Sequence, residues 1–105
     1  MTTNSFFSIY ENYQKQHMAY RTWYPRTNLI QNHALPIIGD LQIFEVTSAH
    51  IDQIYTSMEE SGLKQNTIFG MAAALRSFFK LAMERGYISE TPMANARTIR
   101  QDFTV

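Results

Sequence analysis

The side chains that could serve catalysis or metal binding in this sequence are its histidines, serines, paired acids and tyrosines. The three histidines, His17, His33 and His50, lie far apart and lack a helical ligand spacing such as H-E-x-x-H, so no zinc site is predicted. No serine stands in a G-x-S-x-G context, and the four glycines form no phosphate-binding loop. Glu59 and Glu60 would point about 100° apart on a helix, which indicates a solvated helix end rather than a catalytic dyad. We therefore expect neither a metal nor a cofactor.

The six tyrosines are candidates for a nucleophile, but most of them fall on apolar faces, where packing is the expected role. The chain has no cysteine, which excludes disulfides and thiolate metal sites and is compatible with a reducing compartment. Because no set of reactive side chains converges in the pattern, a free-standing enzyme with a small-molecule substrate is disfavoured.

The length of 105 residues, 45% of them hydrophobic, suits one domain with a single core. Apolar periodicity predicts an all-α fold of four helices. The first is expected over about residues 5–18, with Asn4 or Ser5 as its N-cap. Its inner face is predicted to comprise Phe6, Tyr10, Tyr13 and His17.

The second helix is expected from about Thr22, a plausible N-cap, to Ala34. Pro25 would then stand in the first turn, where its missing donor costs nothing, and Pro36 would end the helix. Its inner stripe is predicted to be Trp23, Ile30 and Ala34, followed by a turn at Gly39. Residues 40–46 are expected to be an extended connector, with Leu41, Ile43 and Phe44 on the core.

The third and fourth helices carry clearer signals. Thr47 or Ser48 can cap the third, and Gly62 can end it. Its apolar face is Ile51, Ile54, Tyr55 and Met58. The fourth ends at Gly86, and its inner face is Ile68, Met71, Ala72, Leu75, Phe78, Phe79, Ala82 and Met83. Its predicted outer face is Asn66, Gly70, Ala73, Ser77, Lys80 and Glu84.

Charge is segregated along the chain although its net value is zero. Residues 12–39 and 61–83 contain no acid, whereas residues 40–60 contain no lysine or arginine. The bases of the two acid-free segments are Lys15, Arg21, Arg26, Lys64, Arg76 and Lys80. A helix face of small residues with basic flanks can approach a phosphate backbone or a groove. The alternatives are a solvated face and a second helix–helix contact.

No apolar run approaches the length of a membrane span, and the first residues lack the pattern of a signal peptide. We therefore expect no membrane association and a cytoplasmic location.

Several short motifs, in order, resemble the core-binding domain of tyrosine recombinases of the phage-integrase type. Residues 22–26 and 33–40, TWYPR and HALPIIGD, resemble the family's second helix and the turn after it. Residues 44–47, FEVT, are similar to the start of its third helix, and residues 62–68, GLKQNTI, to the start of its fourth. LRSFF and AMERGYI, at residues 75–79 and 82–88, resemble the rest of that helix, and Thr91-Pro92 stands where the family usually has Asn-Pro.

This resemblance implies a four-helix SAM-like bundle that forms a clamp on double-stranded DNA together with a catalytic domain. It places a core-binding domain at residues 1–94 and the start of a linker at residues 95–105. The second and fourth helices would face the DNA of the recombination core site. The DNA-binding residues expected on them are Arg21, Thr22, Arg26, Lys64, Asn66, Thr67, Arg76, Ser77 and Lys80.

The resemblance also implies partners and limits. The parent protein would be a recombinase of a mobile element that acts on the nucleoid of a bacterial or phage-host cell and assembles with other protomers. The family's catalytic Arg, His-x-x-Arg and Tyr series has no counterpart in this chain, so the chain itself is not expected to be an enzyme. Many relatives carry an arginine near the position of Gly70, and Lys64 replaces the usual serine cap, which would let the fourth helix begin at Asn66.

A different class of function is a helical protein-interaction module without DNA binding. Its contact surfaces would be the edges formed by Phe6 and Phe7 or by Phe69 and Leu81. Dependence of any DNA binding on salt concentration separates the two hypotheses.

Overall fold

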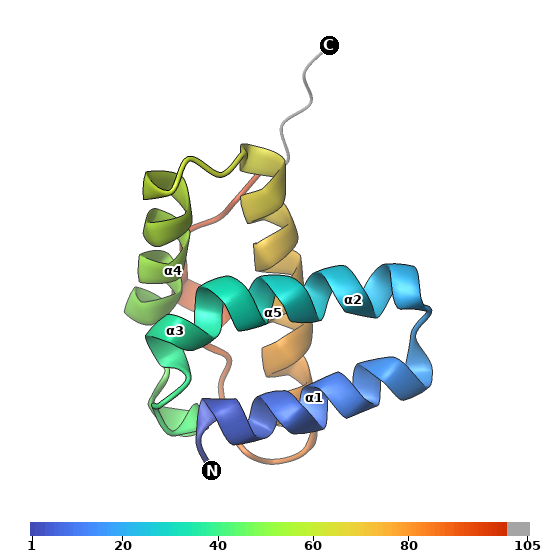
Figure 1. The fold of residues 1–105 in the computed structure, drawn as a ribbon. Coiled ribbons are helices and arrows are strands. Elements are labelled where there is room, and N and C mark those ends of the chain that lie inside the picture. Colours follow the sequence, from blue (N-terminus) through green and yellow to red (C-terminus); the bar gives the residue numbers. More distant parts are fainter. Residues whose placement is uncertain (101–105) are drawn as a thin grey trace.

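The computed structural model describes residues 1–100, and nearly all of its regular structure is helical (Figure 1). Its elements are α1 (Thr3–His17), α2 (Tyr20–Leu29), the π-helical turn η1 (Ile30–Ala34), α3 (Leu35–Ile38), the 3₁₀ turn η2 (Ile43–Glu45), α4 (Ser48–Glu60), α5 (Gln65–Glu84) and the 3₁₀ turn η3 (Pro92–Asn95). Because α2, η1 and α3 run on without a break, the described chain forms four helical rods. The predicted all-α, four-helix architecture is confirmed.

α1 starts earlier than the sequence suggested. Its N-cap is Thr2, whose hydroxyl accepts a hydrogen bond from the Ser5 backbone N–H at 3.1 Å, so the prediction of Asn4 or Ser5 was wrong. The Asn4 N–H donates instead to the Gly39 carbonyl at 3.0 Å. The start of α1 is therefore set by a long-range contact with the turn that follows α3.

The second rod differs from its prediction at both ends. The N-cap of α2 is Ala19, which offers no side-chain hydrogen bond, so Thr22 lies inside the first turn and Pro25 inside the helix. Pro36 does not end the rod. The Leu35 N–H donates to the Ile30 carbonyl, five residues back, and this π-type turn leaves Pro36 in the first turn of α3, where no N–H is needed.

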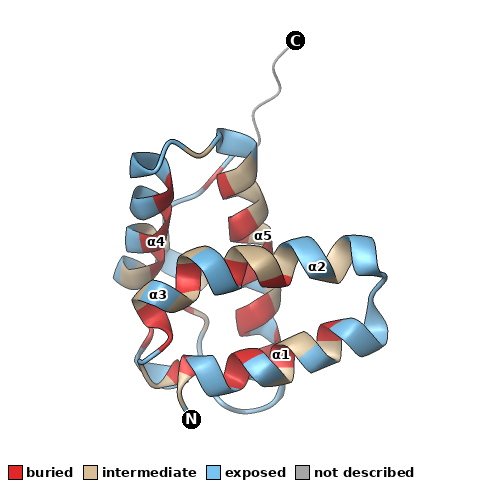
Figure 2. Ribbon diagram, viewed as in Figure 1, coloured by how far each residue is buried: buried red, intermediate tan, exposed pale blue. Residues whose placement is uncertain are grey.

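The core lies between α1, the second rod, α4 and α5, and Figure 2 shows the buried stripes of α4 and α5 facing inward. Phe78 is at its centre, with ring centroids 5.0 Å from Phe6, 5.1 Å from Tyr10 and 5.1 Å from Phe79. The predicted apolar face of α4 is entirely buried. The prediction for α5 is confirmed except at Met83, which is exposed because it lies at the edge of the stripe.

Five other residues predicted to lie on the core are less buried than expected, and two of them, Trp23 and Leu41, are half-buried. His17 is exposed at the end of α1 and Tyr13 is half-buried beside it. Phe44 is 64% exposed, because the connector contains the turn η2, which buries Ile43 and turns its neighbour outward. An isolated antiparallel bridge joins Thr2 to Gln42, and the described residues contain no strand.

The glycines differ in what they provide. Gly62 and Gly86 have φ angles of 80° and 78°, which confirms them as the residues that end α4 and α5. Gly39 has an ordinary helical φ, but a Cβ there would collide with the side chain of Asn4 and the carbonyl of Leu35. Gly39 therefore permits the close approach of α1 to α3.

The segment after η3 packs against the bundle up to the last described residue. Ile99 belongs to the core, and the Gln65 side chain at the start of α5 donates to the Arg100 carbonyl at 2.9 Å. Pro92 is buried next to the other end of α5, so the segment runs antiparallel to that helix. Residues 95–100 of the predicted linker are thus held by α4 and α5, and residues 101–105 lie outside the described part. Within residues 1–100 no helix is long and apolar enough to cross a bilayer.

Candidate nucleic-acid interface

A groove of about 470 Å³ runs between the second rod and the first turns of α5. It is lined by Tyr24, Pro25, Asn28, Leu29, Asn32, Asn66, Thr67 and Gly70. None of these side chains is charged, and amide and hydroxyl groups make up its polar wall. Such groups can hydrogen-bond to base edges and to the sugar–phosphate backbone. We call this surface the α2–α5 groove.

Gly70 lines the groove where α5 passes next to Leu29 of α2. A Cβ at this position would lie 3.5 Å from the Cδ1 atom of Leu29, which is an ordinary van der Waals distance. Gly70 therefore belongs to a helix–helix contact, one of the alternatives that the stripe of small residues left open.

Ser77, further along the same stripe, also serves a contact between helices. Its Oγ accepts a hydrogen bond at 3.1 Å from the hydroxyl of Tyr10, a buried residue of α1. Burial raises the pKa of Tyr10, which keeps its hydroxyl protonated as the donor. The predicted outer face of α5 is thus partly covered by α1 and α2 at Gly70 and Ser77.

Two of the predicted basic residues flank the groove. Arg21 is exposed one helical turn before Tyr24 on α2. Lys64 is exposed as the N-cap residue of α5, directly before the groove residues Asn66 and Thr67; α5 begins at the intervening Gln65, one residue before the start that was suggested. Asn66 and Thr67 thus line the groove together with residues of α2, and Arg21 and Lys64 each lie next to a groove residue on their own helix.

Arg76 and Lys80 lie further along α5, in a second hollow of about 370 Å³ next to Met83 and the residues of η3. Both side chains are exposed, and no acid of the described residues forms an ion pair with either. Lys80 also borders a hollow shared with Tyr13 and Gln14 of α1. These two bases extend the positive surface along α5 away from the groove.

The two other predicted residues are less accessible. Arg26 is half-buried on α2, and its guanidinium lies 3.5 Å from the side-chain oxygen of Gln14. Thr22 is half-buried in the first turn of α2. Their positions connect α2 to α1 more than to the groove.

Sequence reasoning missed three groove residues, Tyr24, Asn28 and Asn32. They recur every four residues, which places polar or amphipathic groups on one face of a continuous helix. The sequence contains this four-residue spacing. The predicted apolar stripe alone did not show which face of the helix would line a groove.

The charge segregation of the sequence becomes a segregation in space. The acids of residues 40–60 lie on the turn after α3, in η2 and on α4, and Figure 1 shows α4 beside α5, with α2 crossing α5. Arg97, from the C-terminal segment, joins them: its N–H donates to Asp52 at 2.7 Å and its guanidinium to Glu59 at 2.9 Å. Among the described residues, neither Arg21 nor Lys64, the two basic residues next to the α2–α5 groove, has such an acid as an ion-pair partner.

The reactive side chains do not assemble into a second site. Burial raises the pKa of Tyr55 to about 12, so its phenol is neutral at physiological pH and unsuited to attack. Tyr20, Tyr24 and Tyr87 are exposed, contrary to the expectation that most tyrosines pack on apolar faces. His50 accepts the Thr47 N–H at the start of α4, and residues 1–100 contain no cluster of metal-ligating side chains.

The surfaces named for a protein-interaction module are largely inside the fold. Phe6, Phe7 and Leu81 are buried and Phe69 is half-buried. Most of these side chains therefore cannot contact a partner protein in this fold.

The fold is that of a small all-helical domain, and comparison with known proteins places it in a family. Residues 2–59, more than half of the chain, match the family described as the phage integrase N-terminal SAM-like domain, and this chain belongs to that family. The solution NMR structure of an integrase-like domain from Bacillus cereus has the same fold, with a TM-score of 0.85 at 18% identity, covering 96% of this chain and 86% of that one. No curated protein matches the sequence at a significant level.

Proposed function

We propose that this chain binds double-stranded DNA with the α2–α5 groove and the bases that flank it, as the core-site clamp of a tyrosine-type site-specific recombinase. The observation that carries the proposal is an uncharged groove with three asparagine side chains in its wall, in a member of an integrase domain family. Basic residues that form no ion pair with an acid of the described residues lie near it. Amide and hydroxyl groups in a groove can hydrogen-bond to the edges of nucleobases and to the DNA backbone. The flanking lysine and arginine side chains can bind phosphates.

In this proposal Arg21, Lys64, Arg76 and Lys80 neutralise phosphates. Asn66 and Thr67, with Asn28 and Asn32 opposite them, contact base edges or sugar–phosphate. Thr22, Arg26 and Ser77 hold the helices that carry these groups, a role that fits their half-buried positions.

The chemistry of strand exchange would belong to a catalytic domain of the parent protein, joined through a linker that starts within residues 95–105. The chain itself would neither cut nor join DNA, and other protomers would meet it through the parent protein on the nucleoid in the cytoplasm. Incubation with a supercoiled plasmid that carries the cognate site tests this. Covalent protein–DNA adducts would contradict it.

The DNA-binding proposal is tested by measuring affinity for a labelled duplex as a function of salt concentration. If about four basic side chains each neutralise one phosphate, the logarithm of the binding constant falls with the logarithm of the salt concentration at a slope of about −3 to −4. Replacing Lys64, Arg76 and Lys80 together by alanine should reduce the slope to about −1, since each contact contributes roughly −0.9.

Arg97→Ala serves as the control, because it removes one base from the α4 side. It should leave the slope unchanged. Binding that does not depend on salt, or an unchanged slope in the triple variant, would remove α5 from the interface and favour a protein-interaction role.

A further inference from the structure

The connection between α1 and α2 presents an exposed aromatic cluster, which we call the hairpin tip: Tyr20, Trp23 and Tyr24. Tyr20 is 62% and Tyr24 43% exposed. Their rings stack with centroids 4.9 Å apart and planes at 23°, and the centroids of Tyr20 and Trp23 lie 5.2 Å apart in an edge-to-face arrangement. The three rings therefore contact one another, although both tyrosines are largely exposed.

Two basic residues lie next to the hairpin tip. The Lys15 ammonium lies 5.3 Å from the centre of the Trp23 ring, and Arg21 is exposed beside Tyr20. The nearest acid in sequence is Glu11, which meets Lys15 at 3.9 Å, and the chain has no other acid before Asp40. This combination of charge and amphipathic rings suits an anionic partner.

The two tyrosine hydroxyls are not used by the fold. Within the described residues neither hydroxyl donates to a side chain or to a carbonyl, whereas the Tyr10 hydroxyl donates to Ser77. The rings alone account for the packing of the hairpin tip. Tyrosine hydroxyls are among the groups that contact phosphate oxygens in protein–DNA complexes.

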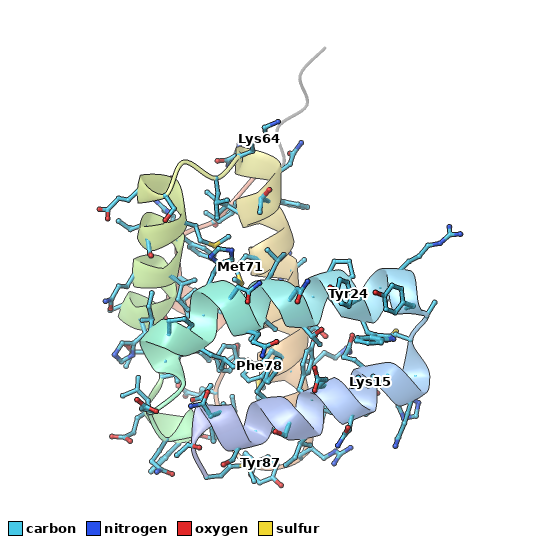
Figure 3. All side chains as sticks on the ribbon, in the orientation of Figure 1. Lys15, Tyr24, Lys64, Met71, Phe78 and Tyr87 are labelled. Atoms are coloured by element: carbon cyan, nitrogen blue, oxygen red, sulfur yellow. The ribbon has the colours of Figure 1, made fainter. Side chains whose placement is uncertain are left out.

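The hairpin tip is continuous with the α2–α5 groove, because Tyr24 belongs to both. Figure 3 shows Tyr24 and Lys15 together at this end of the molecule, with Tyr87 at the far end of α5. We propose that the hairpin tip binds the sugar–phosphate backbone of the duplex that lies in the groove, with the hydroxyls of Tyr20 and Tyr24 donating to phosphate oxygens. This inference rests on the proposed function and extends its footprint to α1.

In this arrangement Lys15 and Arg21 supply the charge, and the hydroxyls fix the position of the backbone. Contacts of this kind read no sequence, so the hairpin tip should strengthen binding to every duplex by a similar factor. The groove would remain the part that distinguishes sequences.

The test is fluorescence anisotropy of the whole chain with a labelled mixed-sequence duplex of about 30 base pairs, roughly three helical turns. The double variant Tyr20→Phe, Tyr24→Phe keeps both rings and removes both hydroxyls. We expect its affinity to fall about a hundredfold, as two lost hydrogen bonds to a charged partner imply. The salt slope should not change, because no charge is removed.

Tyr87→Phe is the matched control, since it removes an exposed hydroxyl from the far end of α5. It should bind like the wild type. If the double variant binds as tightly as the wild type, or if both variants weaken binding equally, the inference is overturned while the proposed function stands. Failure of the wild type to bind any duplex would overturn both.

A second experiment tests whether the hairpin tip binds another copy of this chain instead of DNA. Sedimentation of the wild type and of the variant Tyr20→Ser, Tyr24→Ser should show monomers in both cases. A wild-type dimer that this variant dissociates would assign the hairpin tip to contacts between copies and would contradict DNA binding there.

Discussion

The two sides of α5 treat charge in different ways. On the α4 side, Arg97 crosses from the C-terminal segment and meets Asp52 and Glu59, so that opposite charges pair within the chain. By contrast, the described residues provide no ion-pair partner for Arg21 on α2, for Lys64 at the start of α5, or for Arg76 and Lys80 beside η3. One side is closed by its own chain, and the other presents a groove and bases to solvent.

This difference separates charge that stabilises the fold from charge that is available to a partner. Exposed ion pairs contribute little to stability, so the α2 side would gain little by acquiring acids. A phosphate backbone brings many negative charges at once and would be repelled by acids placed there. The distribution is what a domain needs if α4 and the C-terminal segment hold it together while α2 and α5 bind.

The largest effect should come from removing the core that both sides share. Phe78→Ala is expected to lower the free energy of unfolding by about 3–5 kcal/mol, because it deletes a fully buried ring from the centre of the aromatic cluster. Chemical denaturation measures the change. Met83→Ala, on the exposed edge of the same helix, should cost less than about 0.5 kcal/mol, and similar losses in both variants would contradict the assigned faces.

A smaller effect should show that the C-terminal segment belongs to the closed side. Ile99→Ala should lower the free energy of unfolding by about 2 kcal/mol, since this side chain is 9% exposed and sits at the edge of the core. Thr98→Ala, the exposed neighbour, is the control. If Ile99→Ala is as stable as Thr98→Ala, residues 96–100 behave as a linker and do not pack against α4 and α5.

A pair of arginine variants should separate the arginine that is paired within the chain from one that is not. Arg97→Ala should lower stability by about 0.5–1 kcal/mol, the usual range for an exposed ion pair, and leave DNA affinity unchanged. Arg76→Ala should leave stability unchanged and flatten the salt slope of DNA binding by about one. Chemical denaturation and duplex titration are carried out on both variants. Weaker DNA binding by Arg97→Ala, or a loss of stability in Arg76→Ala, would contradict the prediction.

The sequence was sufficient for the parts of the fold that depend on local periodicity. The inner faces of α4 and α5 follow a regular helical spacing, and their ends are fixed by glycines that adopt positive φ. The start of α1 and the path through Pro36 were not predictable in this way. The first depends on hydrogen bonds to Gly39 and Leu41, and the second on a π-type turn, neither of which leaves a local pattern.

The candidate site was predicted only as a list of basic and polar residues on two helices. Segregation of charge correctly separated α2 and α5 from α4, because the helices keep in space the charges they carry in sequence. Which residues line the groove depends on the crossing of α2 over α5 at Leu29 and Gly70, a tertiary contact. For that reason Asn28 and Asn32 escaped notice while Ser77 was included.

The smallest effect concerns Tyr55, which lies on the closed side beneath Arg97. Its hydroxyl is buried and has no hydrogen-bond partner among the described residues, and the Arg97 guanidinium lies 5.6 Å from the centre of its ring. Tyr55→Phe keeps the ring and removes the unsatisfied hydroxyl, so stability at neutral pH should change by less than about 1 kcal/mol, toward greater stability.

The same substitution should change the response to alkaline pH. The folded pKa of Tyr55 is about 12 against an ordinary value of 10.0, so the stability due to its neutral form is complete below pH 10 and is lost as the pH rises through the folded value. Denaturation of the wild type and Tyr55→Phe at neutral pH and at about pH 11 should therefore show a steeper loss in the wild type. Tyr87→Phe, which lacks an exposed hydroxyl instead, should follow the wild type. Equal losses in the wild type and Tyr55→Phe would mean that the Tyr55 hydroxyl is solvated, and that the C-terminal segment covers α4 less completely than the contacts of Arg97 indicate.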